Sequence, residues 1–152
     1  MQAQRACLDH AAALVRDVQG PVLELGLGNG RTYDHLRELL PDREIFVFER
    51  KVAAHPDCIP DERHLILGDA HDTLPGALKR IGAPAALTHS DMGTGDAAAN
   101  ADLAAFLAPQ LRGLSCVGAV LLSDQEMADG GWQLQALPDG VAEGRYFIYR
   151  AV

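Results

Sequence analysis

Hydrophobic and polar positions follow two different patterns along the chain, one typical of helices and the other of buried strands. In residues 3–18, apolar side chains recur at i, i+3, i+4 and i+7 from Leu8, which predicts an amphipathic helix that ends before Gly20. Three later segments are also predicted as helices: residues 31–40, 71–80 and 96–112. Asp96 is the candidate N-cap of the last helix, and Gly113 is its C-terminal stop.

Between these helices lie short runs of aliphatic, β-branched and aromatic residues, as expected of strands buried on both faces. Five such runs are residues 22–25, 44–49, 64–67, 85–89 and 117–122. Two more, residues 132–137 and 145–150, flank a Pro-Asp-Gly sequence and predict an antiparallel pair. Strands that alternate with helices form a mostly parallel sheet with helices on both faces. We therefore expect an α/β fold: a three-layer, doubly wound sheet of seven strands with an antiparallel C-terminal hairpin.

The length and composition indicate how this pattern is organised. A chain of 152 residues has the size of one domain, and 48% hydrophobic residues are enough for a full core. We expect a single domain over residues 1–152, with an N-terminal helix within residues 1–19 and the core in residues 20–150.

The charge balance narrows the class of partner. There are 13 basic and 21 acidic residues, a formal net charge of −8, and no dense basic stripe, so we expect neither a nucleic-acid partner nor a membrane anchor. The longest apolar run is far shorter than the ~20 residues that span a bilayer. Charged residues interrupt the N-terminal apolar stretch, unlike a signal peptide. Three cysteines without a CxxC pair indicate reduced thiols in a cytoplasmic protein.

The most informative segment is the glycine-rich turn in residues 22–32, which leaves the first strand and enters a helix. Such a turn lets a ligand approach the backbone and a helix N-terminus, whose N–H groups favour anions. Dinucleotide-binding turns have the form G-x-G-x-x-G, which would require a third glycine where this chain has Arg31. The spacing here is G-x-G-x-G, and the Glu24 carboxylate would repel a pyrophosphate but suit an amino group. A tight turn without a ligand stays open as an alternative.

Residues 24–30, ELGLGNG, resemble the first motif of class I S-adenosylmethionine-dependent methyltransferases, an acid and one residue followed by G-x-G-x-G. The resemblance extends over roughly residues 20–150, because that family has a seven-stranded sheet with an antiparallel seventh strand. It implies that the chain binds S-adenosyl-L-methionine, transfers its methyl group and releases S-adenosyl-L-homocysteine. The resemblance places these residues near the methionyl part of the cofactor: Glu24, Gly26, Gly28, Asn29, Gly30, Arg31 and Thr32.

Acidic residues at the ends of the second and third predicted strands extend the resemblance. Glu49 matches the acid that holds both ribose hydroxyls in that family, and a carboxylate can accept two such hydrogen bonds. Asp69, with the backbone of Ala70 beside it, matches the acid that contacts the adenine amino group, and Arg50 is a candidate neighbour of the adenine. Parallel strands end at one edge of a sheet, so these acids and Glu24 are expected to lie together there.

The segment after the fourth predicted strand, residues 88–96, matches the place where this family has acceptor-side residues. It lacks the Asn/Asp-Pro-Pro-Tyr/Phe signature of enzymes that methylate bases or glutamine, which again argues against nucleic acid. His89 and Asp91 are the candidate catalytic bases, and Asp91 is also expected to line the cofactor site. Asp91, Asp124 and Gln125 resemble the oxygen ligands of metal-dependent catechol-type O-methyltransferases. Because Gln125 replaces that group's Asn and a basic residue is missing, no metal is expected.

Several functions other than a metal-independent methyltransferase stay open on the sequence. They are a cofactor-binding module without catalysis, a metal-dependent catechol-type O-methyltransferase and an NAD-dependent oxidoreductase. The acceptor of a methyltransferase would be a small molecule or a protein. Because the predicted core takes up residues 20–150 and the segment 124–131 is short, little chain is left to cover the acceptor. We expect a homo-oligomer to supply that cover, unless the acceptor is itself large.

Overall fold

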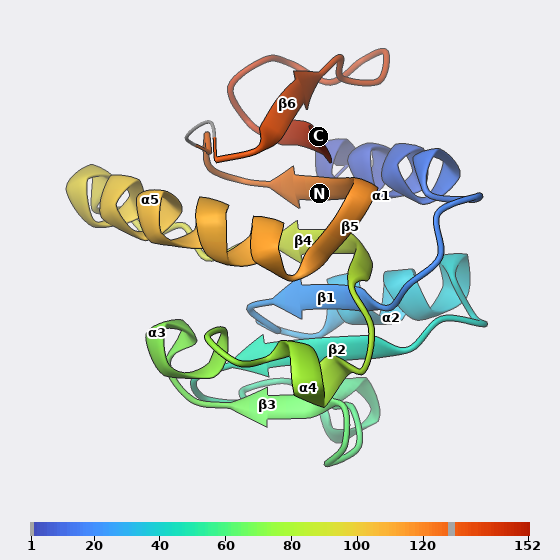
Figure 1. Ribbon diagram of the computed structural model, residues 1–152, viewed down its shortest axis with the longest axis vertical. Coiled ribbons are helices and arrows are strands. Elements are labelled where there is room, and N and C mark those ends of the chain that lie inside the picture. The colour runs from blue at the N-terminus through green and yellow to red at the C-terminus, as the bar shows by residue number, and fades with distance from the viewer. Residues whose placement is uncertain (1, 128–129) are drawn as a thin grey trace.

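The computed structural model describes residues 2–127 and 130–152, and its centre is one sheet of seven strands (Figure 1). The strands are β1 (Val22–Leu25), β2 (Ile45–Glu49), β3 (Leu65–Leu67), β4 (Ala85–Ser90), β5 (Ser115–Ser123), β6 (Trp132–Gln135) and β7 (Phe147–Ala151). Their spatial order is β3-β2-β1-β4-β5-β7-β6. The first five strands pair in parallel, whereas β7 is antiparallel to both β5 and β6. The predicted α/β fold with an antiparallel C-terminal hairpin is confirmed.

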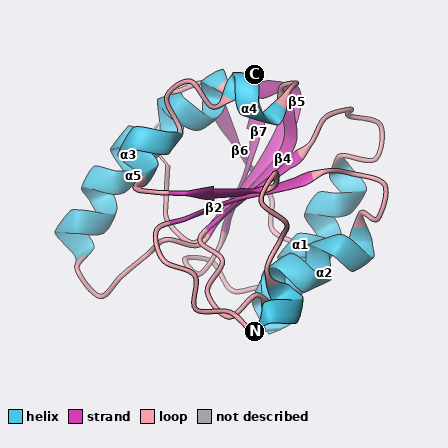
Figure 2. Ribbon diagram, turned by 90° about the horizontal axis from the view of Figure 1, so that it is seen from below, coloured by secondary structure: helices cyan, strands magenta, loops and turns pink. Residues whose placement is uncertain are grey.

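Helices cover both faces of the sheet and make three layers (Figure 2). Helices α1 (Gln2–Leu14) and α2 (Arg31–Leu39) lie on one face. On the other face lie α3 (Ala70–Thr73), α4 (Leu78–Ile81) and α5 (Ala97–Gly113). A short 3-10 helix, η1 (Pro56–Cys58), follows β2. None of the helices in the described ranges is long and apolar enough to cross a membrane.

Two hydrophobic clusters fill the spaces between the layers. Successive strand residues point to opposite faces, so Leu23 and Leu25 of β1 pack under α5, whereas Val22 packs on the side of α1 and α2. Strands that are apolar at almost every position are required by this arrangement, because each face is covered. Glu24 is unusual in this strand, because it is an acidic residue and yet 0% exposed.

The structure differs from the sequence prediction in residues 71–80. One helix was expected there, but the chain forms α3 and α4 with Pro75 and Gly76 between them. Proline has no N–H to continue the helical hydrogen bonds, and Gly76 adopts φ +79°, outside the helical region. The other predicted elements agree to within a few residues at their ends. Asp96 caps α5 as expected, since its carboxylate accepts from two backbone N–H groups at 3.1 Å.

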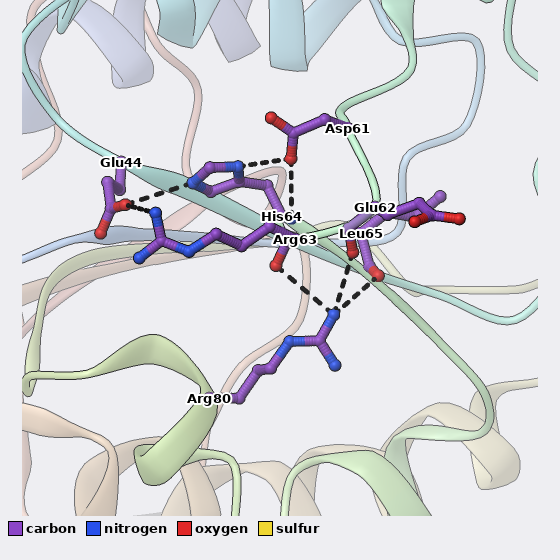
Figure 3. Close-up of polar contacts among 7 residues, drawn as sticks. All are labelled: Glu44, Asp61, Glu62, Arg63, His64, Leu65 and Arg80. Carbon is purple, nitrogen blue, oxygen red and sulfur yellow. Dashed lines mark hydrogen bonds and ion pairs between the residues drawn. The ribbon is translucent and has the colours of Figure 1, made fainter.

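A polar network holds the start of β3 against β2 and α4 (Figure 3). The ring of His64 lies between the Asp61 carboxylate, 2.6 Å from Nδ1, and the Glu44 carboxylate, 3.3 Å from Nε2. Arg63 also pairs with Glu44 at 3.0 Å, and the guanidinium of Arg80 donates to three backbone carbonyls of the same segment. The hydrogen bond from His64 lowers the pKa of Asp61. This network lies at the opposite edge of the sheet from the predicted cofactor residues and serves the fold.

Candidate functional site

The glycine-rich turn after β1 is packed between the neighbouring loops. The Gly26 N–H donates to the carbonyl of Phe48 at 2.9 Å, which ties the turn to the end of β2. A Cβ added at Gly26 would lie 2.9 Å from the carbonyl oxygen of Asp91 in the loop after β4. Only glycine allows this approach, so the first glycine of the motif brings three strand ends together.

The second and third glycines of the motif have different surroundings. A Cβ added at Gly28 would meet no atom within 4 Å, so this part of the turn faces open space. A Cβ added at Gly30 would lie 2.4 Å from the Cβ of Cys58, in the segment that follows β2. Gly28 therefore leaves room for a ligand, whereas Gly30 allows Cys58 to pack closely against the turn.

Helix α2 begins directly after the turn and has no side-chain cap at its N-cap residue, Gly30. Next to it, the Asn29 side-chain oxygen accepts from the Arg31 N–H at 3.0 Å. Thr32 is half-buried, whereas Asn29 and Arg31 are exposed. The N-terminus of α2 directly follows the exposed Gly28 and Asn29, and such a terminus favours an anionic group.

Glu49 joins the end of β2 to the glycine-rich turn. Its Oε2 accepts from the Leu27 N–H at 2.6 Å and from the Gly28 N–H at 3.4 Å. Its Oε1 accepts from the N–H groups of Arg50 at 2.8 Å and Lys51 at 3.4 Å. These contacts hold the carboxylate beside the open part of the turn.

Asp69 follows β3 and forms the N-cap of α3. Its Oδ1 accepts from the backbone N–H of His71 at 2.9 Å and lies 2.8 Å from the ring Nδ1 of the same residue. These hydrogen bonds lower the pKa of Asp69, so the carboxylate is ionised at neutral pH. Ala70 is buried beside it, and the ring of His71 stacks on Phe106 with centroids 4.1 Å apart.

Glu24 and His89 form a buried pair inside the sheet. They lie opposite each other on β1 and β4, and Glu24 Oε1 is 2.7 Å from His89 Nδ1. Burial raises the pKa of Glu24 against the influence of His89. Burial lowers the pKa of His89, but the Glu24 carboxylate outweighs this effect and the pKa of His89 is raised. Both shifts favour a proton held between the two side chains. Each partner also has one buried atom without a hydrogen-bond partner among the described residues, Glu24 Oε2 and His89 Nε2.

The ends of β4 and β5 bring Asp91 and Asp124 together. Asp91 is exposed, and its Oδ2 accepts from the side chain of Gln4 in α1 at 3.4 Å. Asp124 Oδ2 accepts from the Gly93 N–H at 3.0 Å, which fastens the loop after β4 to the end of β5. Burial, together with the neighbouring Asp91, raises the pKa of Asp124. Within residues 2–127 and 130–152, no group of three His, Cys, Asp or Glu side chains has the arrangement of a metal site. The side chains of Gln125 and Asp124 both lie close to Gly93, in the loop after β4.

Tyr146 is a site residue that the sequence analysis missed. It precedes β7, and its ring stacks on His89 with centroids 6.3 Å apart and planes at 25°. Burial raises the pKa of the Tyr146 phenol, and the Asp91 and Asp124 carboxylates add to the effect. In the sequence it is one more apolar residue of a predicted strand. Because that strand is antiparallel, its first residues lie at the same edge as the last residues of β5, which could have indicated this location.

Comparisons with known proteins show the family of the chain. A family model described as S-adenosyl-L-methionine methyltransferase matches residues 1–151. The chain belongs to the S-adenosyl-L-methionine methyltransferase family. A crystal structure of an S-adenosyl-L-methionine methyl transferase from Silicibacter pomeroyi DSS-3 is 47% identical and has a TM-score of 0.92, over 99% of this chain and 92% of that one. No curated protein matches the methyltransferase.

Two more distant structures share the fold of this methyltransferase. A TDP-rhamnose 3'-O-methyltransferase of calicheamicin biosynthesis is 18% identical, with a TM-score of 0.68 over 98% of this chain and 79% of that one. Human methyltransferase-like protein 13, in complex with S-adenosyl-L-homocysteine, is 13% identical, with a TM-score of 0.57 over 99% of this chain and 79% of that one. The predicted family, fold and enzyme class are confirmed, and the NAD-dependent alternative no longer stands.

The cofactor of this methyltransferase is S-adenosyl-L-methionine, and the open edge fits it. Gly28 presents backbone without a side chain to open space, which leaves room for close approach of a ligand. Glu49 and Asp69 are fixed carboxylates at the ends of neighbouring strands, suited to hydroxyl and amino donors. In open parallel sheets, ligands bind at the carboxyl ends of the strands, where these residues lie.

Proposed function

We propose that the methyltransferase holds its cofactor along the carboxyl ends of β1 to β4, from the adenine at β3 to the methyl group near β4. The observation that carries this assignment is the contact between Glu49 and the Leu27 N–H at 2.6 Å. It fixes the proposed ribose ligand next to the glycine-rich turn. Asp69 and the Ala70 N–H would recognise the adenine, beside Arg50. The proposed methionyl ligands are Gly26, Gly28, Asn29, Gly30, Arg31 and Thr32.

Glu24 is proposed to act on the amino group of the cofactor from within the sheet. Its Oε1 is held by His89, while Oε2 has no hydrogen-bond partner among the described residues. This oxygen is buried, so it is proposed to act on an ammonium through a water. His89 is 0% exposed, so an acceptor outside the sheet does not reach it. We therefore propose that His89 positions Glu24, and that the exposed Asp91 is the catalytic base.

Methyl transfer requires alignment, exclusion of water and removal of a proton from the acceptor. Bound at this edge, S-adenosyl-L-methionine supplies an electrophilic methyl group on its sulfonium. Asp91 lies where the loop after β4 meets Gly26, and its carboxylate faces out of the sheet. It is therefore placed to accept a proton from a nucleophile that arrives over β4. Asp124 holds this loop through Gly93 and so positions Asp91.

The acceptor is proposed to be a small molecule or a protein rather than nucleic acid, since the net charge of −8 repels phosphates. We also propose a cytoplasmic homo-oligomer, in which a second copy covers the exposed loop from Asp91 to Asp96. Light scattering at micromolar concentration tests the assembly, and a monomer there would rule out this part of the proposal.

Calorimetric titration with S-adenosyl-L-homocysteine tests the cofactor site. Glu49→Gln removes a charged acceptor of two hydroxyls and should weaken binding by about 10- to 100-fold, from roughly 1.5–3 kcal/mol per charged hydrogen bond. Glu38→Gln, the same change on the exposed side of α2, should bind like the unmodified protein. Unchanged affinity in Glu49→Gln, with the fold intact by circular dichroism, would refute the assignment.

A further inference from the structure

A cavity of about 630 Å³ lies between the end of β6, the loop 136–146 and the start of β7. Its volume is in the range of about 300–1,000 Å³ that is usual for small-molecule sites. Most of its wall is apolar, and the apolar side chains that line it are Leu134, Leu137, Pro138, Val141, Tyr146 and Phe147. Nothing in the cofactor site described above uses this cavity.

The cavity adjoins the edge where methyl transfer takes place. Phe147 pairs with Ser123, the last residue of β5, so the adjacent Tyr146 lies at the carboxyl end of the sheet. One side of Tyr146 lines the cavity, and its ring also stacks on His89 at the end of β4. Asp91 follows His89 by two residues. A molecule in the cavity would therefore contact Tyr146, at the end of the sheet where the proposed base lies.

The charges around the cavity have one sign. Its acidic lining residues are Asp139 and Glu143, and the Asp91 and Asp124 carboxylates lie close enough to act on Tyr146. The lining residues, all within the described part of the chain, include no lysine, arginine or histidine. At the cavity wall itself, a carboxylate or phosphate ligand would meet acidic side chains and no basic one, whereas an ammonium would be attracted.

We propose that this cavity is the acceptor pocket and that its ligand is a small amine with an aromatic or aliphatic body. The apolar wall takes the body, and the acidic residues attract the ammonium. This inference rests on the proposed cofactor site and deepens it. The ammonium gives one proton to Asp91, and the freed lone pair forms the N–C bond to the methyl group. The S–C bond breaks with both electrons going to sulfur, and Asp91 releases its proton to solvent.

Binding of three matched probes tests the charge preference without any cofactor: 2-phenylethylamine, 2-phenylethanol and 3-phenylpropionate. Amide NMR spectra of the protein should show shifts in residues 134–147 with the amine, weaker shifts with the alcohol and none with the carboxylate. Asp139→Asn with Glu143→Gln should weaken amine binding about three- to tenfold, since exposed charges contribute modestly. A control with the same changes at exposed Asp42 and Glu62, far from the cavity, should bind normally.

A second measurement separates this inference from the cofactor assignment. The same protein samples are titrated with S-adenosyl-L-homocysteine to measure cofactor binding. They are also assayed for conversion of S-adenosyl-L-methionine to S-adenosyl-L-homocysteine in the presence of each probe. Two outcomes overturn the amine pocket but not the cofactor site, provided that the protein still binds S-adenosyl-L-homocysteine. In one, the carboxylate probe binds as well as the amine; in the other, no probe shifts the signals of residues 134–147. Loss of cofactor binding in Glu49→Gln with normal amine binding is the expected independent behaviour. Amine-dependent release of the product, reduced in the double variant, supports the inference.

Discussion

Gly28 and Gly30 allow one prediction to be developed with an internal control. Both residues have positive φ, +53° and +85°, so an alanine at either position adopts a left-handed conformation. That conformation costs about 1–2 kcal/mol in each variant. In Gly30→Ala the new Cβ would also lie 2.4 Å from the Cβ of Cys58 and 3.0 Å from its carbonyl oxygen. Overpacking of this kind costs about 1–3 kcal/mol more, whereas Gly28→Ala meets no atom within 4 Å.

The two variants should therefore lose different properties. Gly30→Ala should lower the free energy of unfolding by about 1–3 kcal/mol more than Gly28→Ala. For a chain of this length that is a difference in Tm of roughly 2–12 °C. Gly28→Ala should instead weaken binding of S-adenosyl-L-homocysteine, by about fivefold or more, because its methyl group fills the space left for the cofactor.

Urea denaturation and calorimetry on the same preparations measure both quantities. Equal midpoints and equal m-values for the two variants would show that Cys58 gives way at no cost, which would refute the packing argument. Cofactor affinity that is unchanged in Gly28→Ala would show that the cofactor does not approach this part of the turn. Because both variants pay a similar free-energy cost for the left-handed backbone conformation, the difference between their stabilities reports the packing against Cys58.

Three further predictions concern other parts of the molecule. The pKa of Asp69 should lie below the usual value of about 3.9, since His71 donates hydrogen bonds to the ionised carboxylate. The stability that these hydrogen bonds give is present above about pH 3.9 and is lost as the pH falls through the lowered pKa. A carbon NMR titration with a normal or raised midpoint for Asp69 would contradict this prediction. Asp96→Ala should remove the cap of α5 and cost about 0.5–2 kcal/mol in chemical denaturation, with cofactor affinity unchanged. Trp132→Phe should leave the Ala108 carbonyl without its 2.9 Å hydrogen bond and cost about 1–3 kcal/mol; a Tm equal to that of the unmodified protein would disprove this.

The local pattern of the chain was enough to predict the fold and the position of Glu49 and Asp69 at the ends of two neighbouring strands. Apolar runs and helical periodicity report burial directly, so the seven strands were placed with only small errors at their ends. Glu49 and Asp69 were predicted as neighbours because every parallel strand ends at the same edge, whatever the details of packing. The prediction was less accurate where two local sequence signals pointed to different structures. The helix expected over residues 71–80 is divided because Pro75 and Gly76 outweigh its apolar spacing.

Packing between distant segments decided the rest. Glu24 and His89 are 65 positions apart, and only the register of β1 against β4 makes them a buried pair. The same register removes His89 from solvent and leaves Asp91 as the exposed candidate base. Tyr146 reaches this edge because β7 pairs with β5, where Phe147 lies opposite Ser123. Secondary structure follows from interactions a few residues apart, whereas a site is made by side chains that the folded sheet brings together from far along the chain.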